Sequence, residues 1–554
     1  MNLFDAIFDQ ESPDKVAILF EQQRITYSEL RERTIELMRA LRFLEIEQGD
    51  RVALLLHDSP EFISSFIGIC SYGAIAVPIN MGLRLDEQRA ILNDCAACLA
   101  VVEGHLCDEL LKDAANVLPH LVQVVIVDRA HEGGITASTQ NAPGEPREDV
   151  QSGVSKLWSF ANLTRQAEIT DGISSQVGDD SLRGLMPFPG KEEKLSSFIF
   201  YTSGSTGEPK GAVHRLSDIF YTNQTYCHEV LKPRDGDRMF SSSRLPFSYG
   251  FGNAVSFPLL NGCATILCRE KPTPEVINRV FAEHKPTIFF GVPVIYRLLL
   301  DHHRNIAPLA SSSLRLCVSA GEALPAQLGA EIESTFGVEV LDGIGSTEML
   351  HMWMSNHEGE VRLGSSGKLL KGYEARLLDE EGNAVQVGAE GNLWVKGGSA
   401  ALGYWDKPEL TAKTFVDGWV QTGDLYVRDT DGYWYHMGRS DDCFKSSGQW
   451  VSPVEVEGVL LKHAGVNRAA VVEDFDSNDL PCVCAFVIKA EGSGDNADLE
   501  QELRILVREH LPRHKQPRRY VFVDDLPYTA TGKIQRFKLR EAIGVSSSKF
   551  KVSS

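Results

Sequence analysis

Short apolar runs alternate with amphipathic helical patterns over the first part of the chain. The stretch "KVAILFEQQRITYSEL" (15–30) predicts two short strands, and Thr26 and Glu29 stand at capping-box spacing before the helical pattern "LRERTIELMRALRFL" (30–44). The runs "RVALLLHDSP" (51–60) and "GAIAVPIN" (73–80) predict buried strands on either side of the helical "EFISSFIGICSY" (61–72). Strands that alternate with helices predict a parallel α/β sheet with crossover connections.

Two later strand patterns run directly into glycine-containing turns. These are "LRLCVSAGEALP" (314–325) and "VEVLDGIGSTEML" (338–350). Because ligands of open α/β sheets bind at the carboxyl ends of strands, we expect both turns to converge on one site. From about Gly391 the strands become shorter, which predicts a β subdomain, and the segment after "GRSDD" (438–442) mixes strands and helices as a separate small domain does. The polar stretch from about Gly133 to Lys194 predicts a loop or linker without chemistry.

Composition and charge narrow the class of protein. The chain has 554 residues, 43% of them hydrophobic and 24% charged, as expected of a globular protein of two to four domains. A net charge of -21 argues against general binding to nucleic acid, which needs a basic face. The sequence has neither a continuous apolar run long enough to cross a bilayer nor a signal-peptide pattern at its start, so we expect a cytoplasmic protein.

The stretch "YTSGSTGEPKGAVHR" (201–215) is typical of a loop that holds phosphate. Hydroxyl side chains alternate with glycines that let backbone N–H groups approach oxygen. The stretch is not a P-loop, because Pro209 precedes Lys210 where that motif requires glycine. Taken alone, an ordinary Gly/Ser surface turn fits the pattern equally well.

This loop and six later motifs together resemble the adenylate-forming superfamily of acyl-CoA synthetases, carrier-protein-loading adenylation domains and beetle luciferases. The later motifs are "SAGEALP" (319–325), "DGIGSTE" (342–348), "GYWDKPE" (403–409), "TGD" (422–424), "GRSDDCFKSSGQWVSPVEVE" (438–457) and "TGKIQR" (531–536). The resemblance spans nearly the whole chain. It implies an enzyme that uses ATP and Mg²⁺ to convert a carboxylate to an acyl adenylate, and that then transfers the acyl group to a thiol.

The resemblance also implies a role for individual residues. Lys533 bridges the carboxylate and the α-phosphate, Thr347 donates to the α-phosphate, and Glu348 is the magnesium ligand, so these three are the expected catalytic residues. Asp424 and Arg439 hold the ribose. Ile344 departs from the pattern, since many relatives have an aromatic residue there. The other expected ATP-binding residues are Thr202, Ser203, Gly204, Ser205, Thr206, Gly207, Lys210, Gly321, Glu322, Ala323, Asp342, Gly343, Gly345 and Ser346.

The family's thiol step implies a moving C-terminal domain. The predicted fold class is α/β, with a large N-terminal domain of parallel α/β sheets (1–438) that includes a β subdomain (about 360–438). A hinge (439–441) centred on Asp441 then leads to a small mobile α+β domain (442–554). After rotation, Lys445, Ser446, Ser447 and Gly448 line a tunnel for pantetheine. The alternative for these small residues is an ordinary turn.

The stretches that carry the acid specificity look most like the benzoate-CoA ligase branch. A pocket for a planar ring needs aromatic walls and a thin slot. The candidate pocket residues are His214, Ser248, Tyr249, Phe290, Gly343, Leu350, His351 and Met352. For each wall a plain core role is an equal alternative, and His214 either orients the carboxylate or caps a strand.

Three hypotheses for the function follow. The first is an aryl-CoA ligase, which takes a small aromatic acid and CoA as partners and acts as a monomer or homodimer. The second is a stand-alone enzyme that loads an aryl acid onto the phosphopantetheine of a carrier protein, and a medium-chain fatty acid is a further candidate substrate. The third is a non-catalytic nucleotide-binding scaffold, against which the intact Lys533, Glu348 and Asp424 argue.

Overall fold

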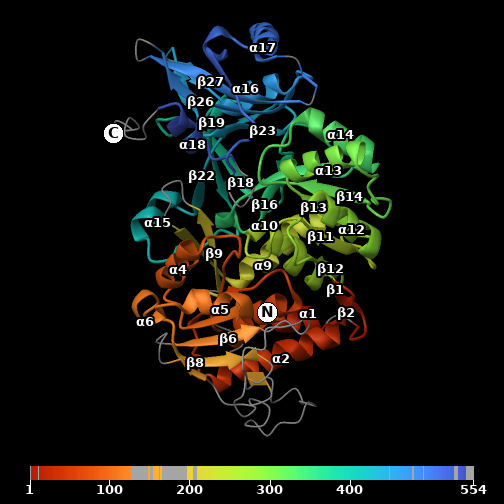
Figure 1. Ribbon diagram of the computed structural model, residues 1–554, viewed down its shortest axis with the longest axis vertical. Helices are drawn as coiled ribbons and strands as arrows, with labels where there is room; N and C mark the ends of the chain where they lie inside the picture. The colour runs from red at the N-terminus through yellow and green to blue at the C-terminus, as the bar shows by residue number, and fades with distance from the viewer. Residues whose placement is uncertain are drawn as a thin grey trace.

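A computed structural model gives the architecture of the chain. It describes residues 2–9, 12–127, 147–149, 154–160, 163–164, 196–203, 209–447, 449–476, 480–490, 492–493, 495–528 and 534–544. Figure 1 shows the C-terminal elements α16 (Pro453–Leu460), α17 (Asn496–His510), β26 (Val466–Phe475) and β27 (Pro481–Lys489) at one end of the molecule, far from α2 (Tyr27–Phe43). The α/β class with a smaller C-terminal part is confirmed.

In the part of the chain that the structure describes, two nine-stranded sheets form the body. The first runs in the order β17 (Lys368–Leu369), β16 (Met352–Ser355), β15 (Val340–Gly345), β14 (Leu316–Ser319), β13 (Ile288–Gly291), β11 (Arg238–Ser241), β12 (Ala264–Leu267), β1 (Val16–Phe20) and β2 (Gln23–Thr26). The second runs in the order β20 (Gly403–Tyr404), β10 (Pro209–His214), β9 (Phe198–Ser203), β4 (Ile75–Pro78), β3 (Arg51–Leu55), β5 (Leu99–Glu103), β6 (Gln123–Val127), β8 (Val154–Ser159) and β7 (Arg147–Asp149).

The strands and helix predicted near the N-terminus are present where the pattern placed them. Thr26 Oγ1 accepts from the backbone N–H of Glu29, and Glu29 Oε2 accepts from the N–H of Thr26, so the capping box begins α2 as predicted. Strands β3 and β4 pair in parallel through the crossover helix α3 (Pro60–Tyr72), which confirms the parallel arrangement.

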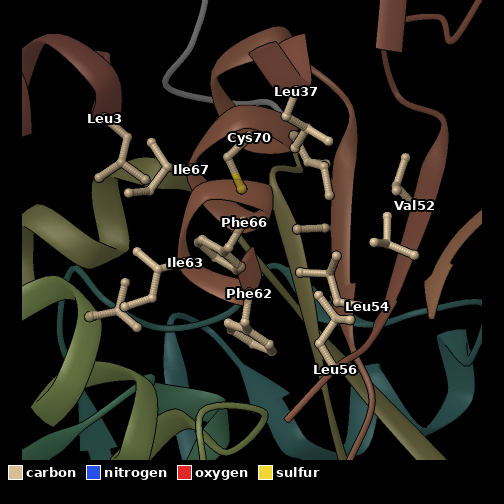
Figure 2. Close-up of a cluster of buried hydrophobic side chains, with 14 of the residues drawn as sticks. Leu3, Leu37, Val52, Leu54, Leu56, Phe62, Ile63, Phe66, Ile67 and Cys70 are labelled. Carbon is tan, nitrogen blue, oxygen red and sulfur yellow. The ribbon is translucent and has the colours of Figure 1, made fainter. Parts of the chain in front are cut away.

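Helix α3 is apolar on nearly every face because it lies in the interior. Figure 2 shows Phe62, Phe66 and Cys70 of this helix pointing into a cluster with Leu37 of α2 and Leu54 of β3. A helix that is apolar all round must be covered on all sides. Among the described residues, the body also contains the α-helices α1 (Leu3–Phe8), α4 (Leu85–Asp94), α5 (Gly104–Leu111), α6 (Ala114–Val117), α9 (Leu216–Thr222), α10 (Ser248–Phe251), α11 (Phe257–Leu260), α12 (Pro274–His284), α13 (Pro293–Asn305) and α14 (Ala326–Phe336).

Two segments of the stretch predicted to be a loop or linker form strands. Val154–Ser159 forms β8, which pairs in parallel with β6, and Arg147–Asp149 forms β7, which pairs antiparallel with β8. The expectation of a loop or linker from Gly133 to Lys194 is therefore wrong for these residues. Trp158 supplies the physical reason, because its ring is buried and packs edge-on against Phe43 with centroids 5.5 Å apart.

Smaller sheets follow in the C-terminal third. A five-stranded sheet joins β18 (Glu374–Leu378), β19 (Glu390–Lys396), β22 (Trp419–Arg428) and β21 (Phe415–Val416), with β23 (Trp434–Arg439) paired to β22, and α15 (Pro408–Thr414) precedes β21. Beyond it lie the hairpin β24 (Phe444–Ser446) and β25 (Gln449–Val451), the three-stranded sheet of β26, β27 and β28 (Arg519–Phe522), and α18 (Arg536–Ala542). The β subdomain is thus present, whereas the boundary at 438 and the hinge stay predictions.

Candidate active site

A hairpin of the second sheet carries the phosphate-loop motif. Strands β9 and β10 pair antiparallel, with Thr202 opposite Lys210. Tyr201 anchors the hairpin, since its hydroxyl donates to Asp94 Oδ2 at 2.6 Å while Lys407 Nζ lies 3.2 Å from Asp94 Oδ1. Gly204, Ser205, Thr206 and Gly207 lie outside the described residues, as do Gly448 and Lys533.

Strand β15 of the first sheet delivers Thr347 and Glu348 beside this hairpin. They form a short 3-10 turn (Thr347–Met349), and the backbone on both sides is tied down. The carbonyl oxygen of Thr347 accepts from His214 Nε2 at 2.7 Å, and the carbonyl of Glu348 accepts from the N–H of Ala401 at 2.8 Å. The hydroxyl of Thr347 lies 3.5 Å from that of Ser248.

The Glu348 side chain has one polar partner from the neighbouring strand. Strand β20 pairs with β10, and its Tyr404 hydroxyl donates to Glu348 Oε1 at 2.7 Å. Burial and the adjacent Glu348 carboxylate raise the pKa of Tyr404, so the phenol stays a donor. The other carboxylate oxygen is a hard donor of the kind that Mg²⁺ prefers. In the part of the chain that the structure describes, no three His, Cys, Asp or Glu side chains converge as a metal cluster.

The two turns predicted to converge do so. Strands β14 and β15 are parallel neighbours, and the backbone N–H of Leu324, next to the "GEA" residues 321–323, donates to Asp342 Oδ2 at 3.5 Å. Burial raises the pKa of Asp342 to about 8, so this carboxyl is protonated at neutral pH. Ile344 is half-buried and packs against the apolar cluster of the first sheet. Gly343 is buried, with the backbone of Met354 so close that a Cβ would collide with it.

Asp424 and Arg439 face each other across two strands of the five-stranded sheet. They are paired residues of β22 and β23, and Arg439 Nη1 lies 3.4 Å from Asp424 Oδ1. His436 Nε2 lies 3.4 Å from the same oxygen. Arg439 Nε also lies 3.3 Å from Asp441 Oδ1, so the arginine touches the expected hinge residue.

An aromatic cluster surrounds His351. Its ring lies 5.6 Å from that of Tyr249, and Tyr249 in turn packs edge-on against Phe290 at 6.4 Å. Burial lowers the pKa of His351 to about 3, which keeps the imidazole neutral. Leu350 and Met352 flank it and are buried, and Leu350 has a left-handed backbone at φ +65. The structure therefore brings the predicted walls together.

Sequence reasoning missed three members of this cluster. Tyr226 and Phe257 lie 4.8 Å and 4.6 Å from the His351 ring, and Asn253 Oδ1 accepts from His351 Nε2 at 3.2 Å. Asn253 and Phe257 fall within "RLPFSYGFGNAVSFPLLNG", the stretch that suggested the pocket. Both residues lie one or two helical turns after Tyr249, so helical spacing from Tyr249 could have predicted them. Tyr226 had none, because a buried tyrosine in a helix looks like any core residue.

His214 is placed differently from the other pocket residues. Its side chain is fully buried, and both ring nitrogens have internal partners, Asp218 Oδ2 at 3.0 Å and the Thr347 carbonyl at 2.7 Å. Its contacts are therefore with Asp218 and with the turn that holds Thr347, and the two expected roles, orienting the substrate carboxylate or capping a strand, stay predictions.

The expected tunnel residues lie apart from the nucleotide residues. Lys445 Nζ is 3.5 Å from Glu380, in the connection between β18 and β19, and Ser446 Oγ donates to the carbonyl of Pro481 at 3.2 Å. Ser447 has a left-handed backbone at φ +54. These contacts involve other elements than those that carry Thr347, Glu348 and Asp424.

The described residues that flank Lys533 contact residues close to the expected hinge. Arg536 forms paired contacts of 2.9 Å with both carboxylate oxygens of Glu457 and lies 3.5 Å from Asp442. Tyr528 and Ile534 pair with each other in an isolated antiparallel β-bridge.

No helix among the described residues has both the length and the apolar character that a membrane crossing requires.

The β9–β10 hairpin, the tethered Thr347–Glu348 turn and the Asp424–Arg439 pair come from three sheets and carry the motifs expected of a nucleotide-dependent enzyme. The chain belongs to the AMP-binding enzyme family, whose description it matches over residues 6–405, and the AMP-binding enzyme C-terminal domain matches residues 455–533.

Individual relatives narrow the class. The chain is 38% identical to the benzoate–CoA ligase of Thauera aromatica over 93% of this chain and 90% of that protein. It superposes on the anthranilate CoA ligase AuaEII in complex with anthranoyl-AMP with a TM-score of 0.86 at 34% identity, covering 99% of this chain and 98% of that one. The benzoate CoA ligase from Burkholderia xenovorans LB400 gives a TM-score of 0.82 at 34% identity, covering 98% and 100%.

Proposed function

We propose that this protein is an ATP-dependent ligase that activates an aromatic acid of the benzoate type as an acyl adenylate and transfers the acyl group to CoA. The observation that carries the proposal is the tethered Thr347–Glu348 turn, which lies between the phosphate hairpin and a neutral aromatic cluster. Relatives named for benzoate and anthranilate support the aromatic substrate.

The first half-reaction joins two anions, so the site must neutralise and align them. Lys210 and the hairpin hydroxyls hold the β- and γ-phosphates, and the Thr347 hydroxyl donates to the α-phosphate. Glu348 is the one carboxylate that would hold Mg²⁺, which neutralises phosphate charge when it is bound. A single protein carboxylate fits a cation that is otherwise ligated by phosphate and water.

The nucleoside and the acid occupy opposite sides of this turn. Asp342, which is protonated at neutral pH, and residues 321–323 form the adenine slot. Asp424 accepts hydrogen bonds from the ribose hydroxyls, and Arg439 holds the Asp424 carboxylate in place. The carboxylate of the acid approaches the α-phosphate, and its ring enters the cluster of Tyr249, Phe290 and His351. A neutral imidazole there adds no charge that would oppose or attract the ring.

Lys533 supplies the positive charge at the α-phosphate in the first half-reaction. It must leave before a thiol can approach, and rotation about Asp441 would bring Lys445 to Gly448 to the adenylate. CoA is the proposed acceptor. The domain bounds and hinge, like the monomeric or homodimeric state and the cytoplasmic location, stay predictions.

A pyrophosphate-release screen tests the proposal. Benzoate, hydroxybenzoates, aminobenzoates, cinnamates and medium-chain fatty acids are each offered with ATP and Mg²⁺, and thioester yields are then compared with CoA and with a holo carrier protein. We expect release with a benzoate-type acid and thioester with CoA. Release with fatty acids alone, or thioester with the carrier alone, would overturn the proposed substrate or acceptor.

A further inference from the structure

His214 sits between two acceptors at the centre of the site. It ends β10, its side chain has no exposed surface, and its ring stacks on Phe198 with centroids 5.4 Å apart and planes 15° from parallel. A carbonyl oxygen can only accept, so Nε2 carries the hydrogen that points at Thr347 O, 2.7 Å away. Nδ1 lies 3.0 Å from Oδ2 of Asp218.

Asp218 is itself held on several sides. Its Oδ2 accepts from the backbone N–H of Arg215 at 3.1 Å, and its Oδ1 accepts from Arg215 Nε at 2.9 Å. The same Arg215 reaches the 397–401 segment, because its Nη2 donates to the carbonyl of Ala400 at 2.8 Å. The next residue, Ala401, donates its N–H to Glu348 O. The peptide carbonyls of Thr347 and Glu348 are therefore both fixed by groups that trace back to Arg215 and Asp218.

The hydrogen bond from His214 fixes the orientation of the Thr347 peptide, and the Thr347 carbonyl does not need this bond to be paired. The Thr347 carbonyl also accepts from the N–H of Leu350 at 3.0 Å, so loss of the imidazole would not leave it unpaired. That second bond closes a turn in which Leu350 holds a left-handed φ of +65, a conformation that costs energy for a branched side chain and persists only when its surroundings hold it. Without His214 the turn can relax, and Thr347 Oγ1 and Glu348 Oε1 move with it.

We propose that His214 is a positioning residue for adenylate formation: through Nε2 it fixes the Thr347 peptide and thereby aims the Thr347 hydroxyl and the Glu348 carboxylate at the phosphates. This inference rests on the proposed function. Displacements of about 1 Å at a reacting group can reduce a rate a hundredfold, so a buried group that touches no substrate can control the chemical step.

Two amide variants separate the two ring nitrogens. The amide nitrogen of Gln reaches the place of Nε2, whereas that of Asn reaches only the place of Nδ1. His214→Gln therefore keeps the donor toward Thr347 O, and His214→Asn keeps only the link to Asp218, which Arg215 still holds in either variant. His214→Leu fills the volume with no donor. His302→Gln is the matched control, because His302 is also buried and faces a carboxylate, Glu275 at 3.5 Å, on helices outside the site.

The readouts are ATP–pyrophosphate exchange, thioester formation from preformed acyl adenylate, and thermal unfolding. We expect exchange kcat to fall about a hundredfold in His214→Leu and His214→Asn and less than about tenfold in His214→Gln, with KM for the acid within about threefold of wild type. Transfer from preformed adenylate and the activity of His302→Gln should stay near wild type.

Two outcomes would overturn the inference. One is activity that follows melting temperature across the three variants, with Leu as active as Gln, since this is the signature of packing alone. The other is equal loss in both half-reactions. A wild-type enzyme that releases no pyrophosphate with any aryl acid would instead refute the proposed function, so the two failures are distinguishable.

Discussion

The hydroxyl of Tyr404 donates a hydrogen bond of 2.7 Å to Oε1 of Glu348, and thus joins the edge strand β20 to the expected magnesium ligand. This contact leaves the carboxylate one defined orientation. Hydrogen bonds to charged groups contribute about 1.5–3 kcal/mol, which is enough to set how the other carboxylate oxygen meets a cation.

Tyr404→Phe should therefore raise the Mg²⁺ concentration that half-saturates pyrophosphate release by about tenfold, which corresponds to about 1.4 kcal/mol. A magnesium titration at saturating ATP measures it. Tyr435→Phe is the control, because its hydroxyl meets Asp429 at 3.2 Å, on a surface turn. An unchanged magnesium dependence in Tyr404→Phe would show that Glu348 needs no such support.

Asp424→Asn should raise KM for ATP by about tenfold and change kcat less, because an ionised acceptor binds a diol more strongly than an amide does. Initial rates across an ATP series give both constants. Asp429→Asn, in the turn between β22 and β23, should leave them unchanged. A fall in kcat with KM unaltered would argue that Asp424 acts on the chemical step.

Asp342→Asn should change how stability depends on pH. The folded-state pKa of about 8 lies above the usual value of 3.8, so the contribution of Asp342 to folding is fully present below about pH 4 and is lost as the pH rises through 8. The free energy of unfolding of the variant, relative to wild type, should rise by at least about 1 kcal/mol between pH 5 and pH 9. Urea unfolding at several pH values tests this, and a constant difference would contradict a protonated Asp342.

Lys533→Ala should nearly abolish ATP–pyrophosphate exchange, by about a hundredfold or more, and spare transfer from preformed adenylate, because the ammonium stabilises charge only at the α-phosphate. Lys538→Ala, on α18, is the matched control. Equal loss in the two half-reactions would contradict the separation of the two steps.

Asp441→Pro should slow thioester formation by about tenfold or more while exchange stays within about threefold, because proline restricts the backbone on which a rotation depends. Asp441→Ala removes the contact with Arg439 without stiffening the chain, and so separates these two effects. Thioester kinetics unchanged in the proline variant would count against rotation at this residue.

The hydrophobic and capping patterns predicted the strands and helices of the two large sheets, because these elements depend on residues that are close in sequence. The capping box of Thr26 and Glu29 and the crossover through α3 depend on residues close in sequence, and the meeting of the β14 and β15 turns follows from sheet geometry. Strand β8 was missed because one buried aromatic, Trp158, decides its pairing within a polar stretch.

Contacts between residues far apart in the sequence are the part of the candidate site that the sequence could not predict. His214 and Thr347 are 133 positions apart, and nothing in either segment indicates that a ring nitrogen of one will meet a carbonyl of the other. Tyr226 was missed for a related reason, since aromatic residues of a pocket and of a core have the same sequence pattern. Motifs carried over from the family predict which residues act in the reaction, whereas the structure was needed to show which groups hold those residues.

Arg439 touches Asp424 on one side and Asp441 on the other, so the expected ribose site and the expected hinge share a single guanidinium. A nucleotide that draws this side chain toward Asp424 weakens its hold on Asp441, and a domain movement that displaces Asp441 alters what Arg439 offers the nucleotide. Such coupling is reciprocal: if nucleotide binding changes the free energy of domain movement, domain movement changes the free energy of nucleotide binding by the same amount. The order of the two half-reactions would then be enforced in part by thermodynamic linkage through one arginine.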